Sequence, residues 1–289
     1  MGSPCSDEPA MTPNPPMWES FIGVIGGLLG GERHGLEPPP PLPSMARESK
    51  AARLLRARRI ARHLEGAYPE SACALIHETP FQLLVATVLS AQTTDLAVNK
   101  ATRALFEEYP DAESMAQSPD GAIAMHIGGI GLWRAKAKNV RELSRRLVAD
   151  FHGEVPADLD ALTSLPGVGR KTATAVLGTA FGLAAGVTVD THMVRINRLL
   201  GLTRSKTPDA IAADLEALLA PKQWPSYTHR VIDHGRLVCV ANRPRCGVCP
   251  LSEECPSAFS ARAGYKPQND DNEPASAKGL SWLRFQAQG

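Results

Sequence analysis

Aromatic residues and long apolar runs are both scarce in this chain, and their scarcity narrows the choice of fold. Phe, Trp and Tyr make up 5% of its 289 residues, whereas hydrophobic residues make up 43%. Ala and Leu must therefore supply most of the core, which favours helices packed on helices. No apolar run approaches the roughly 20 residues that span a bilayer, no basic segment precedes the short one at 21–30, and no strand-like alternation stands out. We expect an all-α, intracellular protein (cytoplasm or nucleoid in a bacterium) without a membrane partner.

A strong net charge is also lacking. The formal net charge is +1, so bulk charge alone does not indicate a nucleic-acid partner. Residues 1–45 hold five acidic residues against Arg33, a net charge of −4, which leaves +5 on the rest of the chain. This segment is rich in Pro and Gly and cannot bury a core of its own, so we expect a disordered leader over 1–45. The polar residues 259–289 are expected to form a flexible tail.

The sequence Leu-Pro-Gly-Val-Gly-Arg-Lys at 165–171 separates two helical segments. Pro166, Gly167 and Gly169 are poor helix formers, so the pattern predicts helix, tight turn, helix. Glycine amides and a helix N-terminus together make a site suited to a phosphate. Lys171 lies in the first turn of the second helix, where the positive end of the dipole disfavours an ammonium, so the amine should be easier to deprotonate. A free amine beside a phosphate-binding turn suggests covalent chemistry on nucleic acid. Taken alone, the stretch is better explained by an exposed helix lysine at a packing corner.

Further polar residues stand beside helical segments. The run at 81–90 predicts a helix at the centre of a bundle because it is apolar nearly all round, although its β-branched residues leave a strand open. Gln92, which follows this run, is either a plain turn residue or a group pointed at a ligand. Asp190 precedes a helical run and is predicted to cap it. An amphipathic basic helix is predicted at 50–64, stopped by Gly66.

Four of the six cysteines crowd into one short segment. Six, two and five residues separate these four, which are Cys239, Cys246, Cys249 and Cys255. Four thiolates from one loop suit either a zinc ion or an iron–sulfur cube, and ligand type does not distinguish the two. The spacing favours a [4Fe-4S] cube, because zinc ribbons pair two closely spaced knuckles and only one close pair is present. Arg243 and Arg245, between the first two cysteines, are expected to offer guanidinium groups to phosphates.

Taken together in their order along the chain, these segments resemble the endonuclease III family of DNA base-excision glycosylases. The stretch at 165–171 is similar to the family's helix–hairpin–helix, with Lys171 at the position of its catalytic lysine. Val-Asp-Thr-His at 189–192 is similar to its aspartate motif, and the cysteine spacing is that of its iron–sulfur loop. The segments 89–92 and 131–132 resemble the two that fill the gap left by a flipped base.

The resemblance covers about residues 48–257 and implies a fold of two helical lobes. A six-helix barrel lobe with the helix–hairpin–helix would span 79–187. An iron–sulfur cluster lobe would be built from 46–78 and 188–258, with the DNA-binding groove between the lobes. The loop from 182 to 190 is one residue longer than in the usual family version, and Thr174 stands where asparagine is common.

The resemblance also implies a bifunctional enzyme of base-excision repair, a DNA glycosylase that is also a lyase at apurinic or apyrimidinic sites. Lys171 would displace a damaged, oxidised pyrimidine and form a Schiff base that cuts the strand by β-elimination, with Asp190 assisting. The partner would be double-stranded DNA with damaged bases or abasic sites, bound by a monomer. The residues expected to contact DNA are Gln92, Leu132, Gly167, Val168, Gly169, His192, Arg243 and Arg245.

Two alternatives stand beside this interpretation. An adenine-mismatch glycosylase, from a monofunctional sister family, would carry a glutamate in the helix that here reads Val-Ala-Thr at 85–87 and would lack the reactive lysine. A non-catalytic DNA-damage-binding module would keep the hairpin and the cysteine loop without needing both Lys171 and Asp190. The presence of both residues favours the bifunctional enzyme.

Overall fold

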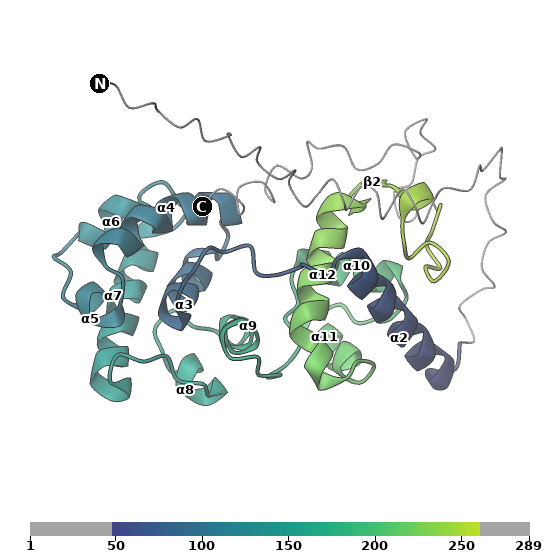
Figure 1. The fold of residues 1–289 in the computed structure, drawn as a ribbon, viewed down its shortest axis with the longest axis horizontal. Coiled ribbons are helices and arrows are strands. Elements are labelled where there is room, and N and C mark those ends of the chain that lie inside the picture. Colours follow the sequence, from purple (N-terminus) through teal and green to yellow (C-terminus); the bar gives the residue numbers. More distant parts are fainter. Residues whose placement is uncertain (1–47, 261–289) are drawn as a thin grey trace, which may run out of the picture. The chain divides into compact units, whose positions relative to one another are not determined.

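The computed structural model describes residues 48–260, and over these residues the fold is all-α, as predicted (Figure 1). The predicted leader at 1–45 and the predicted tail beyond residue 260 lie outside the described residues. None of the described helices is long and apolar enough to cross a membrane. In chain order the helices are α2 (Lys50–Ala67), α3 (Pro80–Leu89), α4 (Asp95–Glu108), α5 (Ala112–Ala116), α6 (Ala122–Ile127), α7 (Trp133–Phe151), α8 (Leu159–Thr163), α9 (Arg170–Ala180), α10 (Thr191–Leu199), α11 (Pro208–Glu216), η2 (Pro221–Gln223), α12 (Trp224–Leu237) and η3 (Cys246–Val248). Two short strands, β1 (Cys239–Val240) and β2 (Arg243–Pro244), form an antiparallel pair.

Helices start where the sequence supplies an acceptor for amides that have no partner inside the helix. In α3 the Thr79 hydroxyl accepts from the Gln82 amide at 3.2 Å, and Pro80 takes the first helical position, which needs no N–H. In α10 the Oδ1 atom of Asp190 accepts from the Met193 amide at 2.8 Å. The predicted cap at Asp190 is therefore confirmed.

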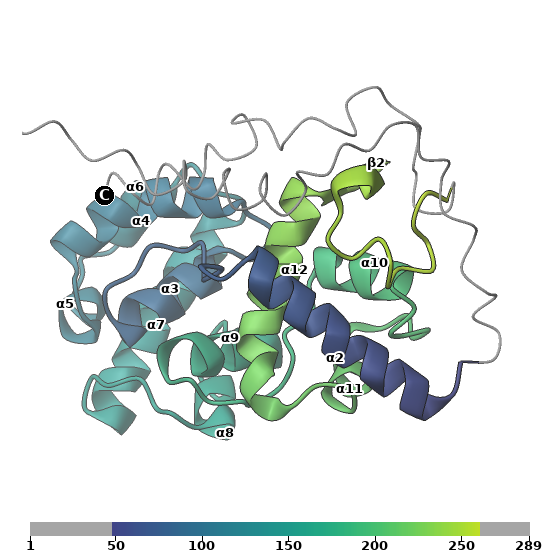
Figure 2. The same ribbon diagram turned by 45° about the vertical axis from the view of Figure 1, so that its right-hand side comes forward.

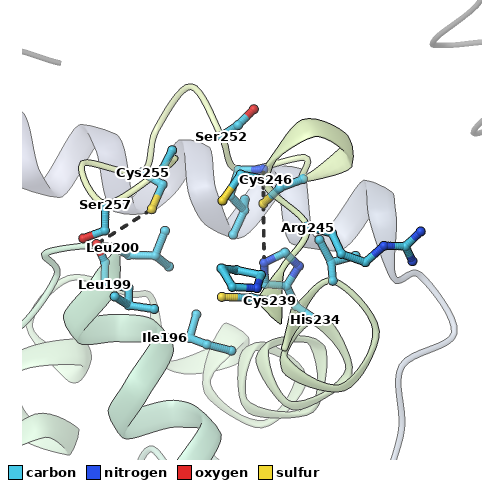
Figure 3. A pocket seen from close by; sticks show the side chains of 15 residues that line it. Ile196, Leu199, Leu200, His234, Cys239, Arg245, Cys246, Ser252, Cys255 and Ser257 are labelled. Atoms are coloured by element: carbon cyan, nitrogen blue, oxygen red, sulfur yellow. Dashed lines mark hydrogen bonds between the residues drawn. The ribbon is translucent and has the colours of Figure 1, made fainter. Parts of the chain in front are cut away.

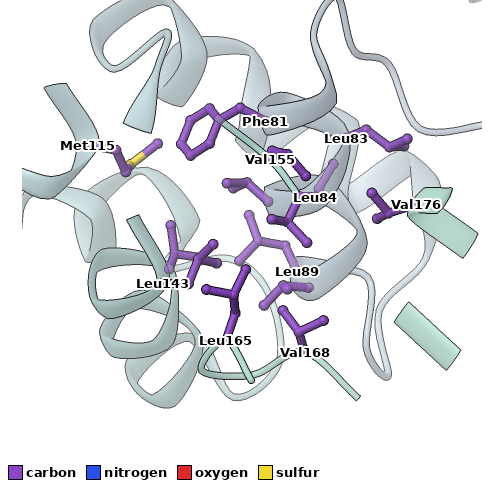
Figure 4. Packing of buried hydrophobic residues seen from close by; sticks show 14 of the residues in the cluster. Phe81, Leu83, Leu84, Leu89, Met115, Leu143, Val155, Leu165, Val168 and Val176 are labelled. Atoms are coloured by element: carbon purple, nitrogen blue, oxygen red, sulfur yellow. The ribbon is translucent and has the colours of Figure 1, made fainter. Parts of the chain in front are cut away.

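The first hydrophobic cluster is centred on α3 and takes side chains from the helices α3 to α9 (Figure 4). Eight of the ten residues of α3 are buried, so the run at 81–90 forms a central helix and not a strand. Leu165 and Val168, from the turn before α9, are 2% and 6% exposed and belong to the same cluster. A fully buried aliphatic side chain of this kind contributes roughly 1.5–3 kcal/mol. These contacts fix the turn on the body of the cluster.

The second hydrophobic cluster joins α2 to α10, α11, α12 and the cysteine loop, and α2 lies against α12 (Figure 2). Arg56 of α2 is buried, and its guanidinium donates to the carbonyls of Leu200 at 2.6 Å and Glu254 at 3.2 Å. The same side chain pairs with Glu48 at 2.8 Å. Helix α2 continues one residue past Gly66, so the predicted stop was wrong. A single glycine costs a helix only about 1 kcal/mol of stability relative to alanine. The packing of α2 in the second cluster stabilises the helix by more than that.

Helix α12 contacts α9 as well, and so connects the two clusters. Gly178 of α9 faces Pro225 of α12, and a Cβ at Gly178 would lie 3.1 Å from Pro225 Cγ. Arg236, near the end of α12, pairs with Asp95 at the start of α4, with 2.6 Å between Nη2 and Oδ2. Because Gly178 has no side chain, the two helices approach closely. Helix α9, which follows the turn at 165–169, therefore packs on α12, which leads into the cysteine loop.

Candidate catalytic site and metal centre

The turn between α8 and α9 depends on Gly167 and Gly169. The Val168 amide donates to the Leu165 carbonyl at 3.1 Å, and Gly167 has a φ of +77°, where a residue with a side chain loses roughly 1–2 kcal/mol. A Cβ on Gly167 would lie 2.9 Å from Nδ2 of Asn139. Gly169 is the N-cap of α9, has no capping side chain, and has nothing within 4 Å of the position of a Cβ. An anion can therefore reach the amides at this helix start.

Lys171 is the second residue of α9, and it is exposed. It stands at the same end of the helix as the uncapped amides. Helix α9 is itself fixed in the first cluster by Ala173, Val176 and Leu177, each at most 2% exposed. A ligand that is seated on the amides would therefore lie beside an amine carried by a rigid element.

Asp190 combines its capping role with an oxygen that remains available. Its Oδ1 atom caps α10, whereas Oδ2 has no hydrogen-bond partner among the described residues. The loop before it is anchored at two points: Oε1 of Glu216 accepts from the Val187 amide at 2.8 Å, and the Thr228 hydroxyl donates to the Thr188 carbonyl at 3.3 Å. These contacts give the loop from 182 to 190 a fixed path to Asp190.

His192, two residues after Asp190, packs against α12. A Cβ on Gly235 would lie 2.5 Å from Nδ1 of His192, so the ring occupies the space that the glycine leaves. Nη2 of Arg195 lies 3.5 Å from the same nitrogen. Burial lowers the pKa of His192 below its ordinary 6.5, although the nearby Asp190 carboxylate opposes the shift. The ring is therefore mainly neutral at pH 7, and its predicted contact with DNA stays a prediction.

Gln92 and Leu132 lie close together, although they belong to separate segments. A Cβ on Gly131 would lie 3.8 Å from the Gln92 carbonyl oxygen. Both residues have left-handed backbones, with φ of 54° at Gln92 and 59° at Leu132, which costs roughly 1–2 kcal/mol each. Both are exposed, and Leu132 leaves 62% of its surface open to solvent. Strained exposed residues of this kind are maintained only where the surroundings hold them.

Lys136 of α7 was not singled out in the sequence, yet it holds these two segments together. It is 5% exposed, and burial lowers the pKa of its ammonium. The Nζ atom donates to the carbonyls of Leu89 at 2.9 Å and Ala91 at 2.7 Å, and to the Thr93 hydroxyl at 2.8 Å. A signal was present: Lys136 precedes the buried Val140 by four residues, which places it on the apolar face of the helix.

The four cysteines line one cavity beside α10 and α12 (Figure 3). Most of the remaining lining is apolar. It includes Ile196 of α10 and Leu200, which directly follows that helix. The Leu251 amide donates to Sγ of Cys249 at 3.4 Å. Contacts of this kind orient and tune metal-bound thiolates. The donor set and its surroundings therefore fit a metal centre.

Burial makes the thiols of this cavity harder to ionise. Burial raises the pKa of Cys255 to about 11, and it raises the pKa of Cys249 further. Thiolates in such a site form readily only when a cation binds them. Within residues 48–260, no group of three or more His, Cys, Asp or Glu side chains has the spacing to hold one metal ion. The four thiols nevertheless line a common cavity.

Arg243 and Arg245 lie on the small hairpin beside this cavity. Arg243 pairs through its backbone with Val240, and its side chain is exposed. Arg245 is half-buried, its amide donates to the Val238 carbonyl at 3.0 Å, and its guanidinium points away from the cavity (Figure 3). The cysteine loop therefore presents one exposed arginine and directs the other outward.

Comparison with known proteins places these features in one family. Residues 85–221 match the HhH-GPD superfamily of base excision DNA repair proteins. Endonuclease III of Synechocystis sp. is 48% identical over 208 residues, which cover 72% of this chain and 95% of the relative. The chain belongs to the endonuclease III family. Endonuclease III of Bacillus subtilis is 44% identical over 191 residues, covering 65% of this chain and 86% of that protein. The family expected from the motifs is thereby confirmed.

Solved structures of endonuclease III also match the fold. A trapped covalent endonuclease III–DNA intermediate, an estranged-adenine complex, has a TM-score of 0.66 at 39% identity and covers 70% of this chain and 95% of that chain. A non-covalent endonuclease III–DNA complex has the same TM-score and identity, and the match covers 70% of this chain and 94% of that chain. A thermostable thymine-DNA glycosylase, 24% identical with a TM-score of 0.63 over 70% of this chain and 95% of that chain, shares the fold.

Proposed function

We propose that this chain is a bifunctional DNA glycosylase of base-excision repair. It removes oxidised pyrimidine bases from double-stranded DNA and cuts the strand at the abasic site. Membership of the endonuclease III family supports this function, as does its similarity to an endonuclease III trapped covalently on DNA. The observation that carries the proposal is the exposed Lys171 at the uncapped N-terminus of α9.

Lys171 is the proposed nucleophile. Its free amine attacks C1′ of the damaged nucleotide, and the base leaves with the electron pair of the glycosidic bond and takes up a proton. The lysine nitrogen then loses a proton, the C1′–O4′ bond breaks, and O4′ takes up a proton, so that the sugar ring opens and a protonated Schiff base forms. This Schiff base makes the C2′ proton acidic. Loss of that proton expels the 3′ phosphate, and water then hydrolyses the imine and releases the lysine. Asp190 activates Lys171 or stabilises the positive charge that develops on the sugar.

The DNA contacts follow from the same arrangement. A damaged base must leave the helix before Lys171 can reach C1′, at a cost of a few kcal/mol. Gln92 and Leu132 fill the vacated space, while the amides of Gly167 and Gly169 hold a backbone phosphate. The open space at Gly169 supports the phosphate site, and the exposure of Leu132 supports the insertion. Arg243, on the cysteine loop, adds a further phosphate contact.

The cavity lined by the four cysteines is the proposed site of a [4Fe-4S] cluster. Family membership supports this cofactor, and so does a common cavity lined by all four cysteines. Bound there, the cluster supplies covalent cross-links that fix the loop carrying Arg243. The two hydrophobic clusters are the proposed cores of the barrel lobe (79–187) and the cluster lobe (46–78 and 188–258).

Borohydride trapping tests the proposed function. The reagent reduces the Schiff base and leaves a stable enzyme–DNA adduct on a duplex with an oxidised pyrimidine. Lys171→Gln is expected to reduce trapping by roughly three orders of magnitude, because the amine that attacks C1′ is then missing. Lys138→Gln, which removes an exposed lysine of α7, is the control and should trap like the unaltered protein. Trapping by Lys171→Gln at the normal rate would disprove the assignment.

A further inference from the structure

If Gln92 and Leu132 enter DNA, the two segments that carry them must stay in place against the displaced bases. Gln92 sits in the turn after α3, and Leu132 immediately precedes α7. Within the turn itself, the Thr93 amide donates to the Ser90 carbonyl at 3.0 Å. Both inserting residues already have left-handed backbones, which neither would keep without support. Displacing stacked bases would push on the two segments and separate them.

Lys136 contacts both segments at once. Its main-chain amide donates to the Leu132 carbonyl at 3.1 Å, in the first hydrogen bond of α7. Its ammonium donates to Leu89, Ala91 and the Thr93 hydroxyl, on either side of Gln92. An ammonium has three N–H donors, so each donor has an acceptor. The side chain thus ties the end of α3 and the following turn to the start of α7.

We propose that Lys136 is a positioning residue that holds the Ser90–Thr93 turn against the start of α7, so that Gln92 and Leu132 enter the DNA as one rigid unit. The inference rests on the proposed function, because it presumes that these residues fill the gap left by the extruded base. Lys136 does not touch the reacting atoms, and its effect reaches the reaction only through the geometry of insertion. A displacement of about 1 Å in such a group can cost a factor of about 100 in rate.

The decisive variant is Lys136→Met, which keeps the length of the side chain and removes the three donors. Lys100→Met, which alters an exposed lysine of α4, is the matched control. Thermal unfolding establishes that each variant is folded. Should Lys136→Met fail to fold, Thr93→Val removes a single acceptor of the ammonium and leaves the two carbonyl contacts in place.

The first measurement needs no chemistry. Each full-length protein is titrated onto a duplex in which 2-aminopurine lies opposite a tetrahydrofuran abasic-site analogue. Insertion of Gln92 and Leu132 unstacks the 2-aminopurine and raises its fluorescence. At saturation, Lys136→Met is expected to give no more than about half the rise of the unaltered protein, since misplaced residues insert poorly, whereas Lys100→Met gives the full rise. A full rise with Lys136→Met overturns the proposal.

The second measurement separates positioning from general damage to the enzyme. A single-stranded oligonucleotide with an abasic site has no opposite strand, so borohydride trapping on it needs no insertion. Lys136→Met is expected to trap within about twofold of the unaltered protein there, while turnover of a damaged base in duplex DNA falls about tenfold or more. Equal losses on both substrates would overturn the positioning role. If the unaltered protein forms no adduct at all, the proposed function has failed, and the fluorescence rise still decides the role of Lys136.

Discussion

Replacing Gly169 with alanine is expected to weaken DNA binding while leaving the fold intact. A Cβ at this position meets nothing within 4 Å, and the φ of −87° suits alanine. Loss of glycine's freedom in the unfolded chain stabilises the variant by about 0.4–1 kcal/mol, which offsets the weaker helix capping by alanine. The melting temperature should therefore stay within about 2 °C. A phosphate on the same amides, however, would meet the new methyl group.

Alanine at Gly167, by contrast, should destabilise the fold. Its φ of +77° costs alanine roughly 1–2 kcal/mol. The new Cβ would lie 2.9 Å from Nδ2 and 3.1 Å from Cβ of Asn139, so that side chain must move. Overpacking of this kind adds about 1–3 kcal/mol. The resulting loss of about 2–5 kcal/mol should lower the melting temperature by at least about 4 °C for a domain of this size.

Thermal unfolding and DNA titration distinguish the two glycines. Gly66→Ala, which also adds a methyl group in open space, is the control and should raise the free energy of unfolding by about 1 kcal/mol. Fluorescence anisotropy on a duplex with an abasic-site analogue, at two salt concentrations, should show about a tenfold loss of affinity for Gly169→Ala. The salt slope should flatten by about 0.9 for one lost phosphate contact. Unaltered binding by Gly169→Ala at both salt concentrations would refute the phosphate site.

Two other substitutions test the ion pair at the start of α2 and the cysteine loop. The Arg56 guanidinium donates to both carboxylate oxygens of Glu48, at 2.8 and 2.9 Å, and lowers the pKa of Glu48. A lowered pKa stabilises the fold above the unfolded value of about 4.3, so Glu48→Gln should lower the melting temperature by about 2–4 °C at pH 7. The difference should shrink as the pH falls below about 4, and equal melting at pH 7 would contradict this account. If the four cysteines hold the proposed [4Fe-4S] cluster, Cys246→Ala should remove the visible absorbance of that cluster. Full retention of the absorbance would contradict the role of Cys246 as a ligand.

Local rules predicted the helices well because their signals lie within a few residues. Thr79 and Pro80 begin a helix through contacts that span three positions, and the apolar run after them could only be buried. Lys136 shows where such rules end. Among the several basic residues at the start of α7 it looks solvated, and only the turn after α3, more than 40 residues earlier, gives its ammonium acceptors. The left-handed backbone of Leu132 likewise depends on packing that no local pattern encodes.

The path of the chain through the two hydrophobic clusters has a consequence for biosynthesis. The first cluster takes its residues from one continuous stretch, Leu75 to Leu177, so it can form as soon as that stretch has left the ribosome. The second cluster pairs Ile60 of α2 with residues as late as Leu251. Helix α2 is therefore made early and must wait, with its apolar face uncovered, until nearly the whole described chain exists. If the four cysteines hold the proposed [4Fe-4S] cluster, its insertion belongs among the last steps of maturation, because the cysteines lie near the end of the described chain. A chain that lacked the cluster would then have a complete first hydrophobic cluster and an exposed helix α2.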